Sequence, residues 1–493
     1  MQEFKSSFVG AVSEHSARLW LRTKTPGPFK LELFSKKEKN STYATIADQR
    51  SADADDTMAF TIPDDVPSVG NLTPATEYKF RITVSATDDV VGEGRFETAP
   101  PKGTKGKFAF AFMSCHQPFN GDGSVNQDSK LMMSALEPAL TARGVKYLLL
   151  IGDQIYADSP NPKSIFQQGN HSSSPKESLN DFRARYQNQY RLFWSFPEMQ
   201  RLQSNFPSWC IWDDHEIVDD WGTKQKHLEP QWQTAFDGAK RAFADYQFSR
   251  TMPFTSSLSP SFHQSFVWGA TGTFIFDLCS ERFFDGHISQ VYGDMQLAAL
   301  TSFLQQQQNQ SIVFVVLTVP LVYLPDWFVA MGERVPKYSK VFATRWNAAQ
   351  NRKSLEQLLD VLRQHKNRNP KQKLVLLSGD VHQSSALKLS WQTGEQAYQF
   401  VSSAVTNAQR NWKQKLAHRI ALSMSAIRHG SQQINIERLN PVLAGQQNPF
   451  GGLNIGIVHV DDDISGPKLR LEIITCDKHL EGRELVAFDS GWL

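Results

Sequence analysis

The stretch that decides the fold is Lys146-Tyr-Leu-Leu-Leu-Ile-Gly-Asp-Gln-Ile-Tyr-Ala-Asp158. Its aliphatic run, 148–151, is typical of a strand buried on both faces, as in the centre of a parallel sheet. Gly152 allows a tight turn, and Asp153 and Tyr156 follow just past the strand end. Because ligands bind at the carboxyl edge of open α/β sheets, these side chains are candidates for a functional site. For one strand alone, a buried strand followed by a polar turn is an equally good interpretation.

The same pattern recurs at three further apolar runs. Residues 108–113 lead into Ser114-Cys115-His116, residues 209–212 into Asp213-Asp214-His215-Glu216, and residues 374–377 into Ser378-Gly379-Asp380-Val381-His382. The run 312–317 is the exception, because Thr-Val-Pro follows it. Taken singly, these residues are typical of turns, solvated loops or a buried cysteine. Four strand ends that carry thiol, phenol, carboxyl and imidazole groups favour one shared functional site.

Length, charge and cysteine content limit the class of protein. A chain of 493 residues is long enough for two or three domains, and its net charge of +2 gives no argument for a nucleic-acid partner. The four scattered cysteines and the lack of a CxxC pair argue against a disulfide framework and structural zinc. No run reaches the about 18 apolar residues of a membrane span. Residues 1–8 resemble no export signal, so we expect a cytoplasmic protein, or a periplasmic or secreted one if a signal was removed.

Residues 1–99 are expected to form an all-β domain. The ranges 16–22, 30–33 and 78–84 alternate with period two and are separated by turn residues, as in a β-sandwich. Leu72-Thr-Pro-Ala-Thr-Glu-Tyr78 resembles the tyrosine-corner segment of fibronectin type III domains. Since no catalytic cluster lies here, a packing or spacer role is favoured. Residues 99–106 are rich in proline, glycine and lysine and predict a linker to a second domain at 107–493.

From residue 107 the sequence alternates between strand and helix patterns. Leucines at helical spacing predict helices over 129–142 and 354–365, whereas the polar range 161–180 predicts a loop over the sheet edge. The range 411–430 is a candidate basic amphipathic helix, for which packing over the site is favoured over membrane-surface binding. The ranges 453–460 and 469–474 alternate like a hairpin. We therefore expect two sheets packed face to face, with this hairpin in the second.

The clustered residues support two kinds of chemistry. Cys115 and His116 could act as nucleophile and base, but adjacent residues of a strand point to opposite faces. A thiolate, a phenolate, three carboxylates and a histidine better suit a multinuclear metal site, with one acidic ion and a harder, oxygen-binding neighbour. An aspartate placed like Asp153 bridges two ions. Coordination lowers the pKa of water from about 15.7 to about 7, so a bridged hydroxide is a strong nucleophile.

Four motifs together resemble those of alkaline phosphatase D, the PhoD-like metallophosphatases, a family related to calcineurin-like phosphoesterases. They are Ser114-Cys115, Gly152-Asp153-Gln-Ile-Tyr156-Ala-Asp158, Asp213-Asp214-His215-Glu216 and Ser378-Gly379-Asp380-Val381-His382, in the family's order. The resemblance implies an α/β class: a four-layer αββα catalytic domain preceded by a fibronectin III or Ig-like sandwich. It also implies hydrolysis of phosphate monoesters and diesters by a metal-activated hydroxide, with ferric iron and calcium (Fe3+ and Ca2+) as cofactors.

The resemblance also implies a role for each candidate residue. Cys115, Tyr156 and His382 would bind the iron, Asp153 would bridge the ions, and Asp214 and Asp380 would bind the second metal. His215 would stand near the leaving group, so Asp153 and His215 are the expected catalytic residues. Asp213 and Glu216 would orient the ligands.

Two departures from the family pattern bear on substrate and compartment. The family often has Asp-Thr-Arg-Ser after a central strand, where this chain has Asp277-Leu-Cys-Ser280 and keeps an arginine only at 282. The export signal of secreted members is also missing. The alternative function is a binding or adhesion module, in which the sandwich binds a partner beside a degenerate phosphatase domain. Intact ligand positions argue against that alternative.

Overall fold

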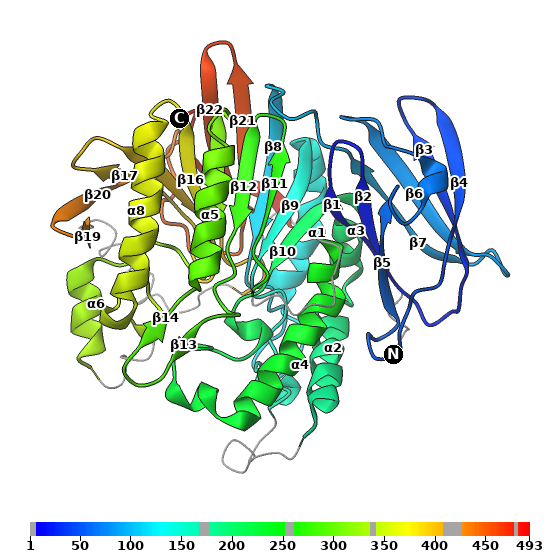
Figure 1. Cartoon of the computed structure of the whole chain (residues 1–493), viewed down its shortest axis with the longest axis horizontal. Coiled ribbons are helices and arrows are strands. Elements are labelled where there is room, and N and C mark those ends of the chain that lie inside the picture. The colour runs from blue at the N-terminus through cyan, green and yellow to red at the C-terminus, as the bar shows by residue number, and fades with distance from the viewer. Residues whose placement is uncertain (1–5, 167–176, 252–260, 336–341, 408–425, 478–481) are drawn as a thin grey trace.

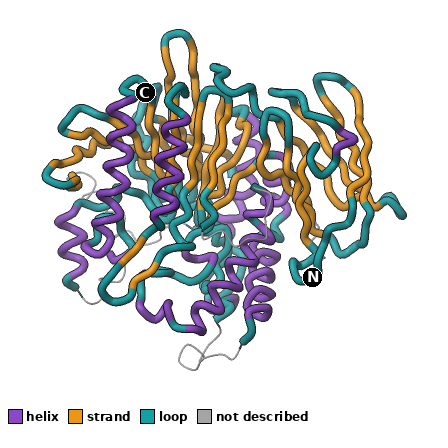
Figure 2. Tube along the Cα trace, in the orientation of Figure 1, coloured by secondary structure: helices purple, strands orange, loops and turns teal. Residues whose placement is uncertain are grey.

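The first seven strands form two antiparallel sheets, called here the sandwich (Figures 1 and 2). The computed structural model describes residues 6–166, 177–251, 261–335, 342–407, 426–477 and 482–493. One sheet has the order β1-β2-β5 (Ser6–Val12, Ala17–Arg22, Thr57–Ile62), and the other β4-β3-β6-β7 (Asn40–Ile46, Phe29–Ser35, Glu77–Val84, Val90–Glu97). Alternate residues of β3 are buried, as period two requires. The all-β amino-terminal region is therefore confirmed.

Tyr78 fixes the loop that precedes β6. Its hydroxyl accepts a hydrogen bond from the Thr73 amide at 2.9 Å, and its ring stacks on Phe96 with centroids 5.5 Å apart. A tyrosine near the start of a strand that bonds back to the backbone a few residues upstream is the geometry of a tyrosine corner.

The stretch 145–151 forms β9, an inner strand next to the edge strand of a six-stranded sheet, called here the first sheet. Its order is β10-β9-β8-β21-β22-β23, with β10 Ser208–Ile211, β8 Lys107–Met113, β21 Ile455–Asp463, β22 Gly466–Asp477 and β23 Arg483–Asp489. β8, β9 and β10 are parallel, and the hairpin β21–β22 pairs antiparallel with β8. The expected place of this hairpin in the second sheet is therefore wrong. Alternation identifies the buried face of a strand, but not the strand beside it.

The second sheet has eight strands in the order β11-β12-β15-β16-β18-β17-β20-β19. They span Gln264–Trp268, Thr271–Ile275, Ile312–Val316, Lys373–Ser378, Gln396–Val401, Ser385–Trp391, Gln432–Arg438 and Ala426–His429. Of the helix expected at 411–430, residues 411–425 lie outside the described residues, and 426–429 form strand β19. The helix prediction is wrong for that part, because pairing with β20 overrides a helical apolar pattern.

The two sheets pack face to face between helices. Phe110 of the first sheet meets Phe314 of the second edge to face, with ring centroids 5.0 Å apart. Helices α1 (Gln127–Ala142) and α3 (Pro197–Asn205) share an apolar cluster with the first sheet, and α5 (Asp294–Gln306) and α8 (Arg352–Arg368) share one with the second. The helices predicted at 129–142 and 354–365 are thus confirmed as α1 and α8. The class is mixed α/β, and its layers run helix, sheet, sheet, helix.

The remaining elements lie around the carboxyl edge of the parallel strands, in the lower part of Figure 1. They are α2 (Leu179–Phe193), α4 (Pro230–Tyr246), α6 (Asp326–Glu333), and the short strands β13 (Phe283–Phe284) and β14 (Ser289–Gln290). The loop predicted at 161–180 is described only at its ends, where a short 3-10 turn and the start of α2 occur. Throughout the described ranges, no helix combines the length and apolar character needed to cross a membrane.

The sandwich packs directly against α4 and the residues that follow it. The indole N–H of Trp20 donates to the Asp245 carbonyl at 2.8 Å, and the fully buried guanidinium of Arg250 lies 4.9 Å from the ring centre of Phe8. Residues of both regions belong to one continuous apolar core. The sandwich therefore shares its core with the region that carries the strand-end motifs.

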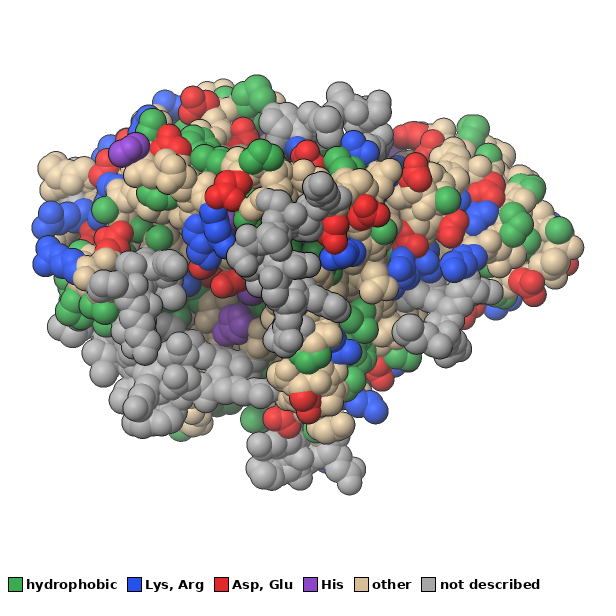
Figure 3. Space-filling model, turned by 90° about the horizontal axis from the view of Figure 1, so that it is seen from below, with side chains coloured by type: hydrophobic (Ala, Val, Ile, Leu, Met, Phe, Trp, Pro, Cys, Tyr) green, Lys and Arg blue, Asp and Glu red, His purple; other side chains and the backbone are tan. Residues whose placement is uncertain are grey.

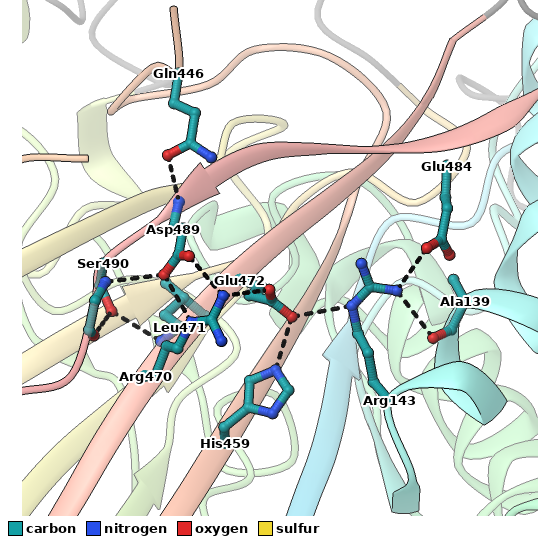
Figure 4. Close-up of polar contacts among 11 residues, drawn as sticks. Ala139, Arg143, Gln446, His459, Arg470, Leu471, Glu472, Glu484, Asp489 and Ser490 are labelled. Carbon is teal, nitrogen blue, oxygen red and sulfur yellow. Dashed lines mark hydrogen bonds and ion pairs between the residues drawn. The ribbon is translucent and has the colours of Figure 1, made fainter. Parts of the chain in front are cut away.

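A charged network ties the carboxy-terminal strands to the end of α1 (Figure 4). Glu472 of β22 accepts hydrogen bonds from Arg143 at 2.9 Å and Arg470 at 2.7 Å, and lies 2.7 Å from His459 Nε2. Burial would raise the pKa of Glu472, but these partners outweigh it and lower the pKa to about 2. These four residues are called the Glu472 network, in which the buried carboxylate is fully compensated.

Candidate metal centre

Four of the expected ligand positions have strained backbone at the ends of strands. Cys115 follows β8 with φ 58°, and Asp153 follows β9 with φ 54°. Asp380 and His382, after β16, have φ 60° and 52°. Non-glycine residues rarely adopt positive φ, and such strain concentrates at functional sites. The strained turns thus lie where the edges of both sheets meet.

Two glycines allow these turns to approach one another. A Cβ on Gly152 would lie 2.6 Å from Cβ of Asp213, and a Cβ on Gly379 would lie 2.3 Å from Oγ of Ser114. Both distances are too short for a side chain, and Gly152 also has φ 92°. Glycine at these positions is what lets the ends of neighbouring strands, and of the two sheets, come together.

Asp153 lies at the centre of the site. Its Oδ2 accepts hydrogen bonds from the Cys115 thiol and the Tyr156 hydroxyl, each at 3.2 Å. Its Oδ1 is buried and has no hydrogen-bond partner within the described part of the chain. A buried carboxylate oxygen without a partner is costly, so this atom points to a missing cation.

Asp214 and His215 lie beside Asp153 in the short 3-10 helix η3 (Asp214–Glu216). One ligand atom of each of these three residues lies within 4.8 Å of the others. His215 Nδ1 donates to Oδ1 of Asp158 at 2.8 Å, and its ring stacks on Tyr156 with centroids 4.1 Å apart. The imidazole is therefore held in one orientation by Asp158 and Tyr156.

His382 and Asp380 approach from the second sheet. His382 Nδ1 donates to the Asn407 carbonyl at 2.6 Å, which leaves Nε2 as the atom able to bind a metal. Its amide donates to Oγ of Ser403, whose hydroxyl lies 3.1 Å from Cys115 Sγ. Asp380 Oδ2 accepts from the Arg345 guanidinium at 2.8 Å. His382 and Cys115 are thus linked through one serine.

Glu216 bonds to the backbone of the ligand-bearing turns. Its carboxylate accepts from the amides of Asp153 and Asp213, each at 2.9 Å, and from the Gln154 amide at 2.7 Å. These bonds fasten the strand ends of β9 and β10 to each other. The position suits the orienting role expected for Glu216.

Burial and mutual repulsion raise the pKa of the site's acids. Burial raises the pKa of Asp153 and Asp213 well above the usual range, and neighbouring acidic groups add to this. For Asp214, burial is again the largest cause, and Asp219 and Asp380 help to raise its pKa to about 7. Burial and then Asp380 raise the pKa of the Cys115 thiol to about 12. Burial and like charges thus oppose ionisation of these groups in the metal-free site, and a bound cation would offset both effects.

The residues fit a metal centre by the chemistry of their donor atoms. Thiol, phenol and imidazole suit iron, and carboxylates suit a harder cation. The expected ligands that the structure gathers here are Cys115, Asp153, Tyr156, Asp214, Asp380 and His382. Seen from below, the carboxyl edge is hollowed, and a histidine side chain lies in the hollow near acidic and basic side chains (Figure 3).

The Cys115–His116 pair does not form a nucleophile and base. His116 Nε2 lies 3.0 Å from the Phe193 carbonyl and Nδ1 lies 3.1 Å from Thr406 Oγ1, so both ring nitrogens are engaged elsewhere. Burial lowers the pKa of His116 to about 4. The ring is a neutral part of the core, as the opposite faces of adjacent residues predict.

Three residues at the site were not identified from the sequence. Asp158 stands in the opening motif, five residues after Asp153, and that place was the only signal. Arg345 lies in a loop between α6 and α8, outside every strand-end motif, and gave no signal. Cys279 donates to Oδ1 of Asp213 at 3.5 Å, although the sequence marked it only as a departure from a family pattern.

Comparison with known proteins identifies relatives of this site and fold. The sequence matches PhoD-like phosphatase over residues 110–441. Among solved structures, one titled "Structure of PhoD" superposes with a TM-score of 0.64 at 16% identity, covering 96% of this chain and 86% of that one. Purple acid phosphatase PPD1 from yellow lupin (Lupinus luteus) seeds has a TM-score of 0.58 at 13% identity, covering 98% and 73%. No curated protein matches the sequence. At these identities the structural likeness concerns the fold alone.

Proposed function

The chain belongs to the PhoD-like phosphatase family and is a phosphoric ester hydrolase, and from this premise we propose that it hydrolyses phosphate monoesters and diesters at the metal centre. The observation that carries the proposal is the buried, unpartnered Oδ1 of Asp153, with ligand atoms of Asp214 and His215 within 4.8 Å. An acidic site of this kind repels an anionic phosphate ester unless cations are bound. Hydrolysis is therefore metal-dependent.

The proposed metals are ferric iron and calcium. Cys115, Tyr156 and His382 would hold the iron, Asp153 would bridge, and Asp214 and Asp380 would hold the calcium. When bound, these metals would supply Lewis-acid activation of water and of the phosphoryl group. Asp213 and Glu216 would keep the ligand-bearing turns in place, as the amide bonds to Glu216 support.

His215 is proposed to give a proton to the leaving group. Burial lowers the pKa of His215, but Asp158, Asp214 and Asp153 outweigh it and hold the pKa well above its usual range. With Nδ1–H held on Asp158, a protonated ring would present Nε2–H to a leaving oxygen. Asp158 thus acts as a positioning residue.

We propose that the amino-terminal sandwich is a fibronectin III-like domain over 1–99, joined to a catalytic domain over 107–493. The hydrogen bond from Thr73 to Tyr78 supports this assignment, since it is the tyrosine-corner contact. A binding module with a degenerate catalytic domain is disfavoured. Such a domain would be expected to have lost ligand side chains, whereas every expected ligand is present.

Elemental analysis of protein purified without chelator, together with a panel of phosphate esters, tests the proposal. A thiolate and a phenolate on ferric iron give visible charge-transfer absorption, so we expect coloured protein with about one iron per chain. Fully active protein with stoichiometric zinc and no iron would contradict the metal assignment. Metal-replete protein that hydrolyses no ester of the panel would support the binding-module alternative.

A further inference from the structure

Arg345 stands at the edge of the acidic site and takes no part in the roles described above. Its Nη1 donates to Oδ2 of Asp380 at 2.8 Å, and its guanidinium lies 5.2 Å from the ring centre of Tyr323. A guanidinium stays protonated in proteins, so the Arg345 side chain brings a positive charge to this edge of the site.

The guanidinium of Arg345 has N–H donors beyond the one that Asp380 accepts. Within the described contacts only Nη1 has an acceptor, and 15% of the side chain is exposed to solvent. A guanidinium presents several N–H groups in a planar fork that matches two oxygens of a phosphoryl group. The donors not used by Asp380 therefore remain available to a ligand in the site.

The loop that carries Arg345 is held at three points. Arg282 Nη2 donates to the Thr344 carbonyl at 3.0 Å, and Asn351 Nδ2 donates to the Arg345 carbonyl at 2.8 Å. The indole of Trp346 donates to the Val319 carbonyl at 3.1 Å. A side chain carried on an anchored loop loses little further freedom when it binds, which favours affinity.

The other charged side chains around the site bear on the role of Arg345. Asp153, Asp213 and Asp214 supply no positive charge that could hold an anionic substrate. The nearby Lys224 pairs with Asp220 at 2.8 Å, and Arg282 is turned to a backbone carbonyl. Arg345 instead adjoins Asp380, an expected metal ligand, and so adjoins the place where the reacting phosphoryl group would bind.

We propose that Arg345 is a substrate-binding residue whose guanidinium donates to a non-bridging oxygen of the phosphoryl group. The inference rests on the proposed function and adds to it a protein cation that holds the substrate beside the metals. Loss of a charge-assisted contact of this kind weakens binding by about 10- to 100-fold.

The test uses Arg345→Gln, which keeps an amide donor for Asp380 but removes the charge. Binding of inorganic phosphate to the metal-loaded protein is measured by titration calorimetry, which needs no turnover, and KM is measured with nitrophenyl phosphate. We expect phosphate affinity and 1/KM to fall by about 10- to 100-fold with unchanged metal content. Arg345→Lys keeps the charge without the fork and should lose less. Arg81→Ala, a paired surface arginine of the sandwich, is the control.

Two results would overturn the inference. One is unchanged phosphate affinity and KM in folded Arg345→Gln. The other is that Arg345→Gln loses metal and that excess metal then restores normal phosphate affinity. In that case Arg345 would only support Asp380. If Arg345→Gln does not fold, Arg345→Lys decides between the same outcomes. A wild-type protein that binds phosphate through Arg345 but hydrolyses no ester would instead contradict the proposed function.

Discussion

Buried carboxylates occur in two regions of the molecule, and their surroundings are opposite. In the Glu472 network, two arginines and a histidine lower the pKa of the carboxyl to about 2. At the metal centre, burial and neighbouring acids raise the pKa of Asp153, Asp213 and Asp214. The first carboxylate is already neutralised by the protein, whereas the second group requires a cation from outside. The comparison teaches that the partners of a buried acid, and not its burial, separate a structural network from a functional site.

We expect the largest effect when a buried acid of the metal centre is changed to its amide, with the same change in the Glu472 network as the control. Asp153→Asn removes the charge that we propose bridges the metals. It should lower metal occupancy and reduce turnover by about 1000-fold or more, since metals contribute several kcal/mol of transition-state stabilisation. Its matched control, Glu472→Gln, should retain metal and turnover. Elemental analysis and kcat/KM measure both. Near-normal turnover by metal-replete Asp153→Asn would show that the Asp153 carboxylate is not needed to bridge the metals.

His215→Asn tests whether the site's imidazole moves a proton. An alkoxide leaving group needs protonation, whereas nitrophenolate is already a stable anion. General-acid assistance contributes about 10²–10⁴-fold, so alkyl phosphate hydrolysis should fall by that factor and nitrophenyl phosphate hydrolysis far less. Metal content should not change. Equal losses on both substrates would assign His215 to binding, and loss of metal would make it a ligand.

Without metal, the acids of the site should make the protein less stable as the pH rises. The folded pKa of Asp214 is about 7, against an ordinary 3.8, so the metal-free folded state binds its proton more tightly than the unfolded state. Its stability is then greatest below about pH 4 and falls as pH rises to 7, by about 2–4 kcal/mol. Urea unfolding of chelator-treated protein between pH 4 and pH 7 measures this. A metal-free protein that becomes more stable over that range would contradict the sign.

The smallest effect is expected at the Glu472 network, and it has the opposite sign. The folded pKa of Glu472 is about 2, below its ordinary 4.5, so its stabilisation is complete above pH 4.5 and is lost as pH falls to 2. Glu472→Gln should lower the free energy of unfolding at pH 7 by about 1–3 kcal/mol. It should also flatten the acid limb of the stability profile. An unchanged acid limb would show that the network contributes little.

The sequence predicted those parts of the fold that depend on local pattern. The buried strand at 148–151 and the helices at 129–142 and 354–365 follow from apolar runs and their spacing. The strand is buried as expected, but it lies second from the edge of its sheet and not at the centre. The sheet joined by the carboxy-terminal hairpin could not be predicted, because β21 pairs with β8, more than 300 positions earlier in the chain. A pattern within one strand carries no information about so distant a partner.

Candidate ligands could be predicted at strand ends, but the contacts that position them could not. This holds where the partner follows a strand, as Asp158 does, and where it lies in a loop, as Arg345 does. Cys115, Asp153, Asp214 and Asp380 come directly after apolar runs, so their types and positions were readable. Arg345 reaches Asp380 from a loop, and the orientation of His382 depends on a carbonyl of Asn407. Such contacts join segments 35 and 25 positions apart, so no local pattern reveals them.

The most direct test of the central claim is the metal content of the purified protein, measured with its phosphatase turnover before and after chelation. If the acids of the centre need an external cation, protein purified without chelator should contain stoichiometric metal. Chelation should then remove metal and turnover together, and readdition should restore both. Full turnover by protein that has been shown to be metal-free would contradict the account.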